Sequence, residues 1–325
     1  MFKKSKKGYY FWEEFAKMDG LVHGISTRRF GSIKSNGQIN RENLRNFLEV
    51  LGIDIKRTVF PKQVHGSGVV TINDSQKNYI MNFAVVIPTS VEGSHTTSFG
   101  ERDSSTEFTL SEAEVLGMTG GAKLKYILKA DGLITNKKNV FLGIVTADCL
   151  PVIFYDKKMG IVGIAHAGYK GLLRGIIQEM IKGMKKIGSD LKNMKIAIGP
   201  AIGLCCYDVP IERAEVFENA FKGIKTYEKR NGKYFLDLKS ITRQILISEG
   251  IRKKNIEVSQ MCTKDNLNDF FSFRGEGQKF GEFVTVIGRK TGFYSSSDRV
   301  RRGSREVYND SSRLRSAMQN YARTI

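Results

Sequence analysis

Three apolar runs, separated by very short polar segments, constrain the fold of this chain more than any other feature. Residues 140–145, 150–155 and 160–165 are rich in β-branched and aromatic side chains. Runs of this length and composition predict three buried strands. Only residues 146–149 separate the first two runs, so Asp148 and Cys149 are expected at a break between strands, where a reactive side chain is accessible.

Helices are expected between and after further strands. In 171–187 the apolar residues recur every three or four positions, which predicts one amphipathic helix that begins near Tyr169 and ends before Gly188. The remaining predicted elements are helices at 212–221 and 239–247 and strands at 195–198, 256–261 and 283–287. This interleaving predicts a mixed α/β, or α+β, class in which mixed β-sheets form the core and helices pack outside.

Composition divides the chain of 325 residues into three parts. Residues 1–20 are expected to be a basic N-terminal extension, and residues 21–290 a single domain that carries the chemistry. A loop insertion rich in Ser, Thr, Gly and Glu is expected at about 88–125. Residues 291–325 form a basic tail rich in Ser and Arg, which is typical of a poorly ordered terminus.

The formal net charge of +19 raises the question of a nucleic-acid partner. The basic residues are scattered, and the sequence has no helix-turn-helix, zinc-finger or aromatic RNA-binding signature, so nucleic acid is an unlikely partner. No run approaches the roughly 20 apolar residues of a membrane span, and the four cysteines are too few and too irregular for a disulfide scaffold. A cytoplasmic protein without a membrane partner is expected.

The candidate chemistry lies where Cys and His interrupt the apolar runs. Cys149 lies between two predicted strands, His166 lies at the end of a third, and His65 precedes Gly66. Thiolate and imidazole suit zinc, and three protein ligands leave a fourth position open. The spacing forms no compact ligand motif, so an inert buried Cys149 and two hydrogen-bonded core histidines remain the alternative. His23 and His95 are expected to be structural or exposed.

Six ordered motifs narrow this choice through a resemblance. They are Gln63-Val64-His65-Gly66, Ala130-Asp131-Gly132-Leu133-Ile134-Thr135, Thr146-Ala147-Asp148-Cys149-Leu150-Pro151-Val152, Ala165-His166-Ala167-Gly168-Tyr169-Lys170-Gly171, Gly199-Pro200-Ala201-Ile202-Gly203 with Cys205-Cys206-Tyr207, and Phe271-Ser272-Phe273-Arg274. Over residues 21–289 the chain closely resembles the YfiH/YlmD-type laccase-domain family, long called polyphenol oxidases and now regarded as zinc-dependent purine nucleoside phosphorylases.

The resemblance implies a YfiH-like fold with zinc, or alternatively copper, held by His65, Cys149 and His166. It implies phosphorolysis of adenosine, inosine and methylthioadenosine, with adenosine deamination as a further activity, so the expected partners are a purine nucleoside and phosphate. Some bacterial members are linked to editing of peptidoglycan precursors. The chain has only four histidines, which argues against a multicopper oxidase. A homodimer is a further expectation.

Candidate substrate-binding residues follow from the same motifs. Residues 168–171 open a predicted helix, whose free N–H groups favour an anion, and Lys170 adds a positive charge. The family usually has Trp-Arg in place of Tyr169 and Lys170, and Lys lacks the bidentate fork of Arg. Arg28 and Arg274 are expected to clamp phosphate or ribose, and Tyr169 to stack on a purine. Asp148 is expected to orient a ligand or accept a proton, or else to form a turn between strands.

Two rival functions and one side question stay open at this stage. A metal-free cysteine hydrolase would use Cys149 as the nucleophile and His166 as its base. A basic nucleic-acid binder would instead use the charged surface and tail. Cys205 and Cys206 are expected to pack as small apolar residues near the pocket rather than to bind metal.

Overall fold

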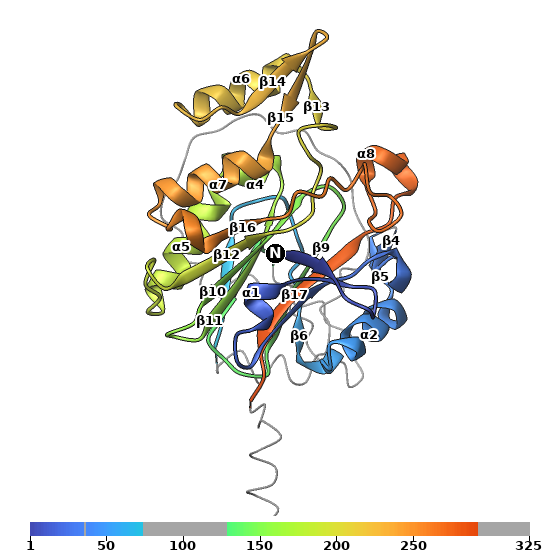
Figure 1. The fold of residues 1–325 in the computed structure, drawn as a ribbon, viewed down its shortest axis with the longest axis vertical. Helices are drawn as coiled ribbons and strands as arrows, with labels where there is room; N and C mark the ends of the chain where they lie inside the picture. Colours follow the sequence, from blue (N-terminus) through green and yellow to red (C-terminus); the bar gives the residue numbers. More distant parts are fainter. Residues whose placement is uncertain (36, 74–128, 292–325) are drawn as a thin grey trace, which may run out of the picture. The chain divides into compact units, whose positions relative to one another are not determined.

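The computed structural model describes residues 1–35, 37–73 and 129–291 (Figure 1). The insertion expected at 88–125 and His95 lie outside the described residues, as does the basic tail apart from residue 291. The chain separates into two compact units, Met1–Arg289 and Lys290–Ile325. All elements below belong to the first unit.

Two six-stranded sheets form the centre of this unit. The first has the order β1 (Phe2–Lys4), β2 (Tyr10–Trp12), β3 (Leu21–Ile25), β17 (Phe283–Arg289), β9 (Phe141–Thr146) and β6 (Thr58–Val59). The second has the order β16 (Ile256–Val258), β12 (Met194–Ile198), β10 (Leu150–Asp156), β11 (Ile161–Ala167), β8 (Gly132–Thr135) and β7 (Val69–Ile72). Both sheets mix parallel and antiparallel pairs.

The three apolar runs are strands, but they do not share one sheet. β9 lies in the first sheet, whereas β10 and β11 pair in the second. Residues 147–149 therefore carry the chain from one sheet to the other. Each strand is buried on both faces, which is why the runs are continuously apolar instead of alternating.

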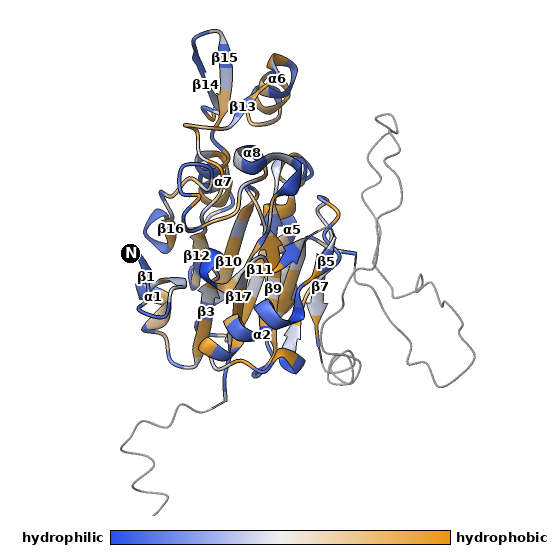
Figure 2. Ribbon diagram, turned by 90° about the vertical axis from the view of Figure 1, so that its right-hand side faces the viewer, coloured by the Kyte–Doolittle hydropathy of each residue, from blue (hydrophilic) through white to orange (hydrophobic). Residues whose placement is uncertain are grey.

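The two sheets face each other and helices cover their outer sides. Leu142 and Ile144 of β9 share one core with Ile153 of β10 and Val162 of β11. The other face of the second sheet packs on α5 (Ile176–Lys186) and α7 (Leu238–Ser248), and the other face of the first sheet packs on α2 (Arg41–Val50). The central strands β9, β10 and β11 are largely hydrophobic, whereas α2 and β14 (Tyr227–Arg230) are largely hydrophilic (Figure 2). This arrangement matches the predicted class of mixed sheets with helices outside.

Shorter elements complete the unit. A small sheet has the order β13 (Asp208–Val209), β15 (Lys233–Leu236) and β14 (Tyr227–Arg230), and β4 (Lys34–Ser35) pairs with β5 (Gln38–Ile39). The remaining helices are α1 (Glu13–Ala16), α4 (Tyr169–Leu173), α6 (Ile211–Ala220) and α8 (Phe273–Glu276), with 3-10 turns at Arg28–Phe30, Ile55–Arg57, Lys253–Asn255 and Gly277–Lys279. Among the described residues, no helix is long and apolar enough to cross a membrane.

The single helix expected after Tyr169 is two helices. Gly175 lies between α4 and α5 with φ of 82°, a left-handed conformation that glycine adopts without a steric penalty. The Gly175 N–H donates to the carbonyl of Leu172, and this hydrogen bond closes the last turn of α4. The apolar spacing continues across the break because residues of both helices pack on the same core, so periodicity alone predicted one helix.

Residues 1–20, expected to be an extension, contribute β1 and β2 to the first sheet. Register pairs Phe2 with Trp12 and Tyr10 with Ile25 of β3. Trp12 and Phe15 are almost completely buried. Lys3 and Lys4 lie on the exposed edge strand β1, and the charge of the lysines in this segment concealed the apolar side chains that anchor it.

Candidate metal centre

His65, Cys149 and His166 converge although they are far apart in the sequence. Their ligand atoms all lie within 4.8 Å of one another. The rings of His65 and His166 meet edge to face, with their centroids 4.7 Å apart. The structure thus brings together the three residues that the sequence analysis selected as metal ligands.

Each of the three side chains comes from a different connection or strand end. His65 lies between β6 and β7, Cys149 in the crossing between the two sheets, and His166 near the end of β11. Antiparallel pairing of β10 with β11 sets Pro151 opposite His166, which places Cys149 beside the end of β11. The non-glycine residues His65 and Asp148 have positive φ values of 56° and 83°, so the backbone is locally constrained at this site.

Asp131 fixes the position of two of these residues. Its side chain is completely buried. One carboxylate oxygen accepts hydrogen bonds from His166 Nδ1 at 2.8 Å and from the His65 N–H at 3.0 Å. The other accepts from the N–H groups of Gly66 at 2.7 Å and Val64 at 3.2 Å. Because Nδ1 faces Asp131, Nε2 of His166 is left for Cys149 or a metal ion.

The sequence analysis missed the role of Asp131, although this residue lies in one of its six motifs. A signal was present, because the charged Asp131 stands directly before a run of apolar residues. Its partners come from residues 64–66 and 166, which a linear reading does not connect.

Gly168 leaves space for two of the candidate ligands, and Gln63 anchors the loop that carries His65. A Cβ at Gly168 would lie 2.8 Å from Cys149 Sγ and 3.4 Å from a carbon of the His65 ring, so only glycine leaves room for both side chains. The amide of Gln63 donates to the carbonyl of Val145 at 2.8 Å and accepts from its N–H at 2.9 Å. This pair attaches the loop of His65 to β9.

The charges of Cys149 and His166 are mutually stabilising. Burial raises the pKa of the Cys149 thiol, but the charge of His166 and hydrogen bonds from both imidazoles outweigh burial and lower this pKa to about 6. Burial lowers the pKa of His166, but the Cys149 thiolate and Asp131 outweigh it and raise this pKa. Without metal the two groups form a thiolate–imidazolium pair.

The donor set fits one metal ion. Two imidazole nitrogens and one thiolate, with a carboxylate behind one imidazole, match the ligands and outer partners of zinc sites with an open coordination position. The same donors also suit copper, so the arrangement identifies a candidate centre without selecting the metal. Among the other histidines, His23 is buried and accepts a hydrogen bond from the Trp12 N–H, a structural role.

Comparison with known proteins identifies the family. The family model described as multi-copper polyphenol oxidoreductase laccase matches residues 31–290. The chain belongs to this laccase-domain family. The prediction made from the six motifs is confirmed.

Relatives within the laccase-domain family carry two kinds of name. The chain is 37% identical over 175 residues to a protein of Bacillus subtilis named purine nucleoside phosphorylase YlmD, a match that covers 53% of this chain and 63% of that relative. It is 28% identical over 295 residues to adenosine deaminase RL5 from an unknown prokaryotic organism, covering 85% of this chain and 97% of that protein.

Solved laccase-domain structures have the same fold. The crystal structure of YlmD from Geobacillus stearothermophilus superposes with a TM-score of 0.70 at 25% identity, covering 89% of this chain and 99% of that one. Bacillus licheniformis hypothetical protein YfiH gives a TM-score of 0.68 at 26% identity with the same coverage. The predicted fold class is confirmed.

Both carboxylate oxygens of Asp148 in this laccase-domain chain have hydrogen-bond partners. One accepts from Thr263 Oγ1 at 2.6 Å and the other from the Arg274 N–H at 2.7 Å. Asp148 therefore ties the crossing that carries Cys149 to two later segments of the chain. This geometry favours the turn-forming and positioning alternative over a free proton acceptor.

Of the three basic residues expected to bind substrate, Lys170 and Arg274 lie beside tyrosine rings, and Arg28 lies over a phenylalanine ring. Lys170 is exposed on α4, four residues after His166, with its Nζ 5.9 Å from the ring centre of Tyr169. The Arg274 guanidinium lies 5.3 Å from the ring centre of Tyr207 and donates to Asp208. Arg28 instead pairs with Glu276, lies over Phe271 and donates to the Phe270 carbonyl, and none of these described contacts involves the three candidate ligands.

Arg213 is a further basic residue at this place that the sequence analysis did not select. Its guanidinium lies 4.2 Å from the ring centre of Tyr169. Burial raises the pKa of Tyr207 to about 12, and both Arg213 and Cys149 act electrostatically on the same hydroxyl. Tyr169 is the first residue of α4, so Arg213 lies at the start of the helix that follows His166. No signal in the sequence points to Arg213, because α6 and Tyr169 are far apart in the sequence and meet only in the folded chain.

Proposed function

We propose that this chain is a zinc-dependent purine nucleoside phosphorylase that acts on adenosine, inosine and methylthioadenosine, with adenosine deamination as a further activity. The observation that carries the proposal is the convergence of His65, Cys149 and His166 around one point. Buried Asp131 holds His166 there through a hydrogen bond to its Nδ1. The names of the Bacillus subtilis relative and of RL5 support the two activities.

The residues that would hold the metal are His65, Cys149 and His166. Zinc bound there would supply a Lewis acid with one open coordination position. The low pKa of Cys149 supports binding, because the thiolate is the ligand form. Asp131 holds His166 in the tautomer that directs Nε2 toward Cys149.

Phosphorolysis makes specific demands on the remaining residues. The bond between ribose C1′ and the purine nitrogen breaks, its electron pair leaves with the base, and a phosphate oxygen forms the new bond to C1′. The base then takes up a proton. The protein must therefore hold an anion against C1′ and stabilise the negative charge that develops on the base.

Lys170, Arg213 and Arg274 supply the positive charge for this task. Arg213 and Arg274 are already placed, because each lies against a tyrosine ring. An arginine held in this way loses little entropy when it binds phosphate, and its fork can engage two oxygens. Lys170 adds a mobile charge, and half-buried Tyr169 offers aromatic surface for a purine.

A second candidate function has its own observation. Cys149, His166 and Asp131 are arranged like the nucleophile, base and orienting carboxylate of a cysteine hydrolase, and the Cys149 pKa is lowered to about 6. A metal-free enzyme that attacks a carbonyl through Cys149 would use the same three groups.

One set of measurements separates these functions. Purified full chain is analysed for metal and incubated with inosine or adenosine, with and without phosphate, and the released base and any inosine formed from adenosine are quantified by chromatography. We expect bound zinc and base release that requires phosphate, and we expect His65→Ala and Cys149→Ala to lose base release together with the metal ion of this centre. Turnover in protein stripped of metal, abolished by alkylation, would support the cysteine hydrolase instead.

The anion-binding role of Lys170 is tested with a matched lysine. We expect Lys170→Ala to raise the KM for phosphate about tenfold, whereas Lys182→Ala on the exposed face of α5 leaves it unchanged. An equal effect of the two substitutions would assign the change to general surface charge.

A further inference from the structure

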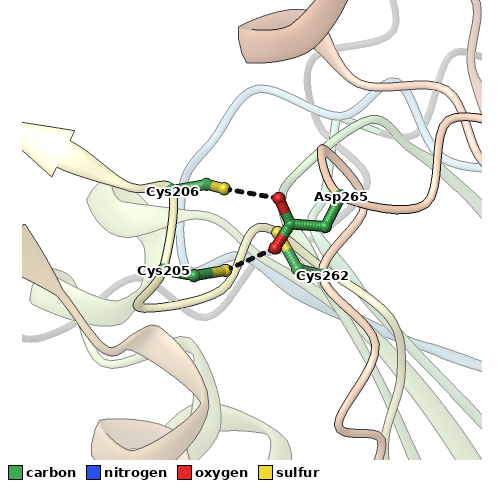
Figure 3. Close-up of side chains that lie close together, drawn as sticks. All are labelled: Cys205, Cys206, Cys262 and Asp265. Carbon is green, nitrogen blue, oxygen red and sulfur yellow. Dashed lines mark hydrogen bonds between the residues drawn. The ribbon is translucent and has the colours of Figure 1, made fainter.

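A second group of side chains that could bind a metal ion shares no residue with the three candidate ligands. Ligand atoms of Cys205, Cys206, Cys262 and Asp265 all lie within 4.8 Å of one another. The thiols of Cys205 and Cys206 each donate to a different oxygen of Asp265, at 2.9 Å, and Cys262 lies beside them (Figure 3). Half-buried Cys206 packs against the apolar core as expected, whereas Cys205 is exposed.

Two separate segments of the chain build this group. Residues 203–207 form a tight turn in which the N–H groups of Cys206 and Tyr207 both donate to the Gly203 carbonyl. This turn presents two consecutive thiols on one side. Cys262 and Asp265 come from a segment more than 50 residues later, joined to the turn by a bridge between Ala201 and Cys262 and by the Gly203 N–H, which donates to Cys262 Sγ at 3.3 Å.

The donor chemistry matches a closed four-coordinate zinc site. Zinc prefers tetrahedral sets dominated by thiolate, with Zn–S distances of about 2.3 Å and Zn–O distances of about 2.0–2.2 Å. Ligand atoms at these distances are about 3.3–3.8 Å apart, so small side-chain rotations from the present separations suffice. Three sulfurs and one carboxylate fill all four positions, whereas the candidate centre at Cys149 has three ligands.

Nearby cations compensate the charge of such a site. Three thiolates, one carboxylate and one divalent ion sum to −2. Lys239 is buried and donates to the Met261 carbonyl, next to Cys262, and Arg230 donates to the Leu204 carbonyl, next to Cys205. Lys264 precedes Asp265 and acts on its carboxylate electrostatically. These cations would compensate part of the negative charge of such a complex.

We propose that Cys205, Cys206, Cys262 and Asp265 bind a second zinc ion, which fastens the 203–207 turn to the 262–265 segment. This role is structural and goes beyond the proposed function. It does not depend on the reaction that the chain catalyses.

The fastened segments both border the first centre. Thr263 donates to Asp148, and the Ile202 N–H donates to the Asp148 carbonyl, so each segment contacts the residue next to Cys149. Tyr207 ends the turn that carries the two cysteines. Loss of the second ion is therefore expected to loosen the first site without removing its ligands.

Metal analysis of paired variants tests the proposal. The full chain, purified under reducing conditions and dialysed against zinc, should contain two zinc ions. Cys149→Ala and the double variant Cys205→Ser with Cys206→Ser should each contain one, and their combination none. A wild-type content of one that the double variant retains would overturn the proposal, whatever the fate of phosphorolysis.

Cobalt gives an independent readout that does not depend on the stability of the double variant. In Cys149→Ala, the only cysteines left are those of the second group, so Co²⁺ should produce sulfur-to-cobalt charge-transfer absorption, which Asp265→Ala weakens. No such absorption in folded Cys149→Ala protein would contradict the site. A disulfide among these cysteines, detected as two missing thiols in denatured protein kept from reductant, together with no bound metal after reduction, would also overturn it.

Discussion

Asp131→Asn tests whether the buried carboxylate orients the candidate metal centre. The substitution keeps the shape of the side chain and removes its charge and one acceptor. With the amide nitrogen facing Gly66, the N–H groups of Val64 and Gly66 lose their acceptor. With it facing His166, the His65 N–H loses its acceptor and His166 can change tautomer to accept from the amide. At about 1–3 kcal/mol for each buried donor left without a partner, the metal-free protein should lose about 1–6 kcal/mol of stability.

The effect on metal affinity is separate from the effect on stability. Removing the hydrogen-bond partner of a metal-ligating histidine typically weakens binding 10–100-fold, about 1.4–2.7 kcal/mol. Zinc affinity is measured by competition with a chelating dye in the background Cys205→Ser with Cys206→Ser, so that only the first centre is titrated. Unfolding of the metal-free protein is followed in denaturant.

Asp156→Asn is a matched control. Asp156 is also completely buried and accepts hydrogen bonds from three N–H groups, those of Lys158, Met159 and Asp190. It lies at the other end of β10 from Cys149, about 20 Å away along the strand. Both variants should lose stability, but only Asp131→Asn should lose zinc affinity. Unchanged affinity in Asp131→Asn would refute the orienting role.

Three further predictions concern the same region. Alkylation of Cys149 in metal-free protein should be half-maximal near pH 6, since the thiolate exists above its lowered pKa and is lost as the pH falls through it; a midpoint near 9 would show an ordinary thiol. Gly168→Ala should weaken metal binding at least tenfold, because its Cβ would lie 2.8 Å from Cys149 Sγ, whereas Gly68→Ala, with its nearest contact at 3.7 Å, should not. Gly175→Ala should lower the free energy of unfolding by about 1–2 kcal/mol and Gly175→Asn by less; equal losses would argue against the left-handed break.

The three long apolar runs were predictable as strands from the sequence. The runs that became β9, β10 and β11 are apolar throughout because both faces of each strand are covered. The break at Gly175 was not predictable from spacing, because the apolar side chains on both sides reach the same core. β1 and β2 were missed because lysines dominate their segment, and because pairing with β3 depends on register that no local pattern records.

The candidate site was predictable in its reactive residues and not in their supports. Cys149 and His166 stand out because they interrupt apolar runs, His65 was selected with them, and the six motifs strengthened all three. Asp131 and Arg213 act only through contacts between distant segments. The group at Cys205 was not predictable for the same reason, since Cys262 and Asp265 lie more than 50 residues later and the adjacent thiols alone suggest only packing.

The crossing between the two sheets has a consequence for assembly of the protein. His65 follows a strand of the first sheet, Cys149 lies where the chain passes between the sheets, and His166 belongs to the second. A partly folded intermediate with only one sheet formed lacks part of this ligand set. During refolding, tight metal binding should therefore begin only when the two sheets have packed against each other.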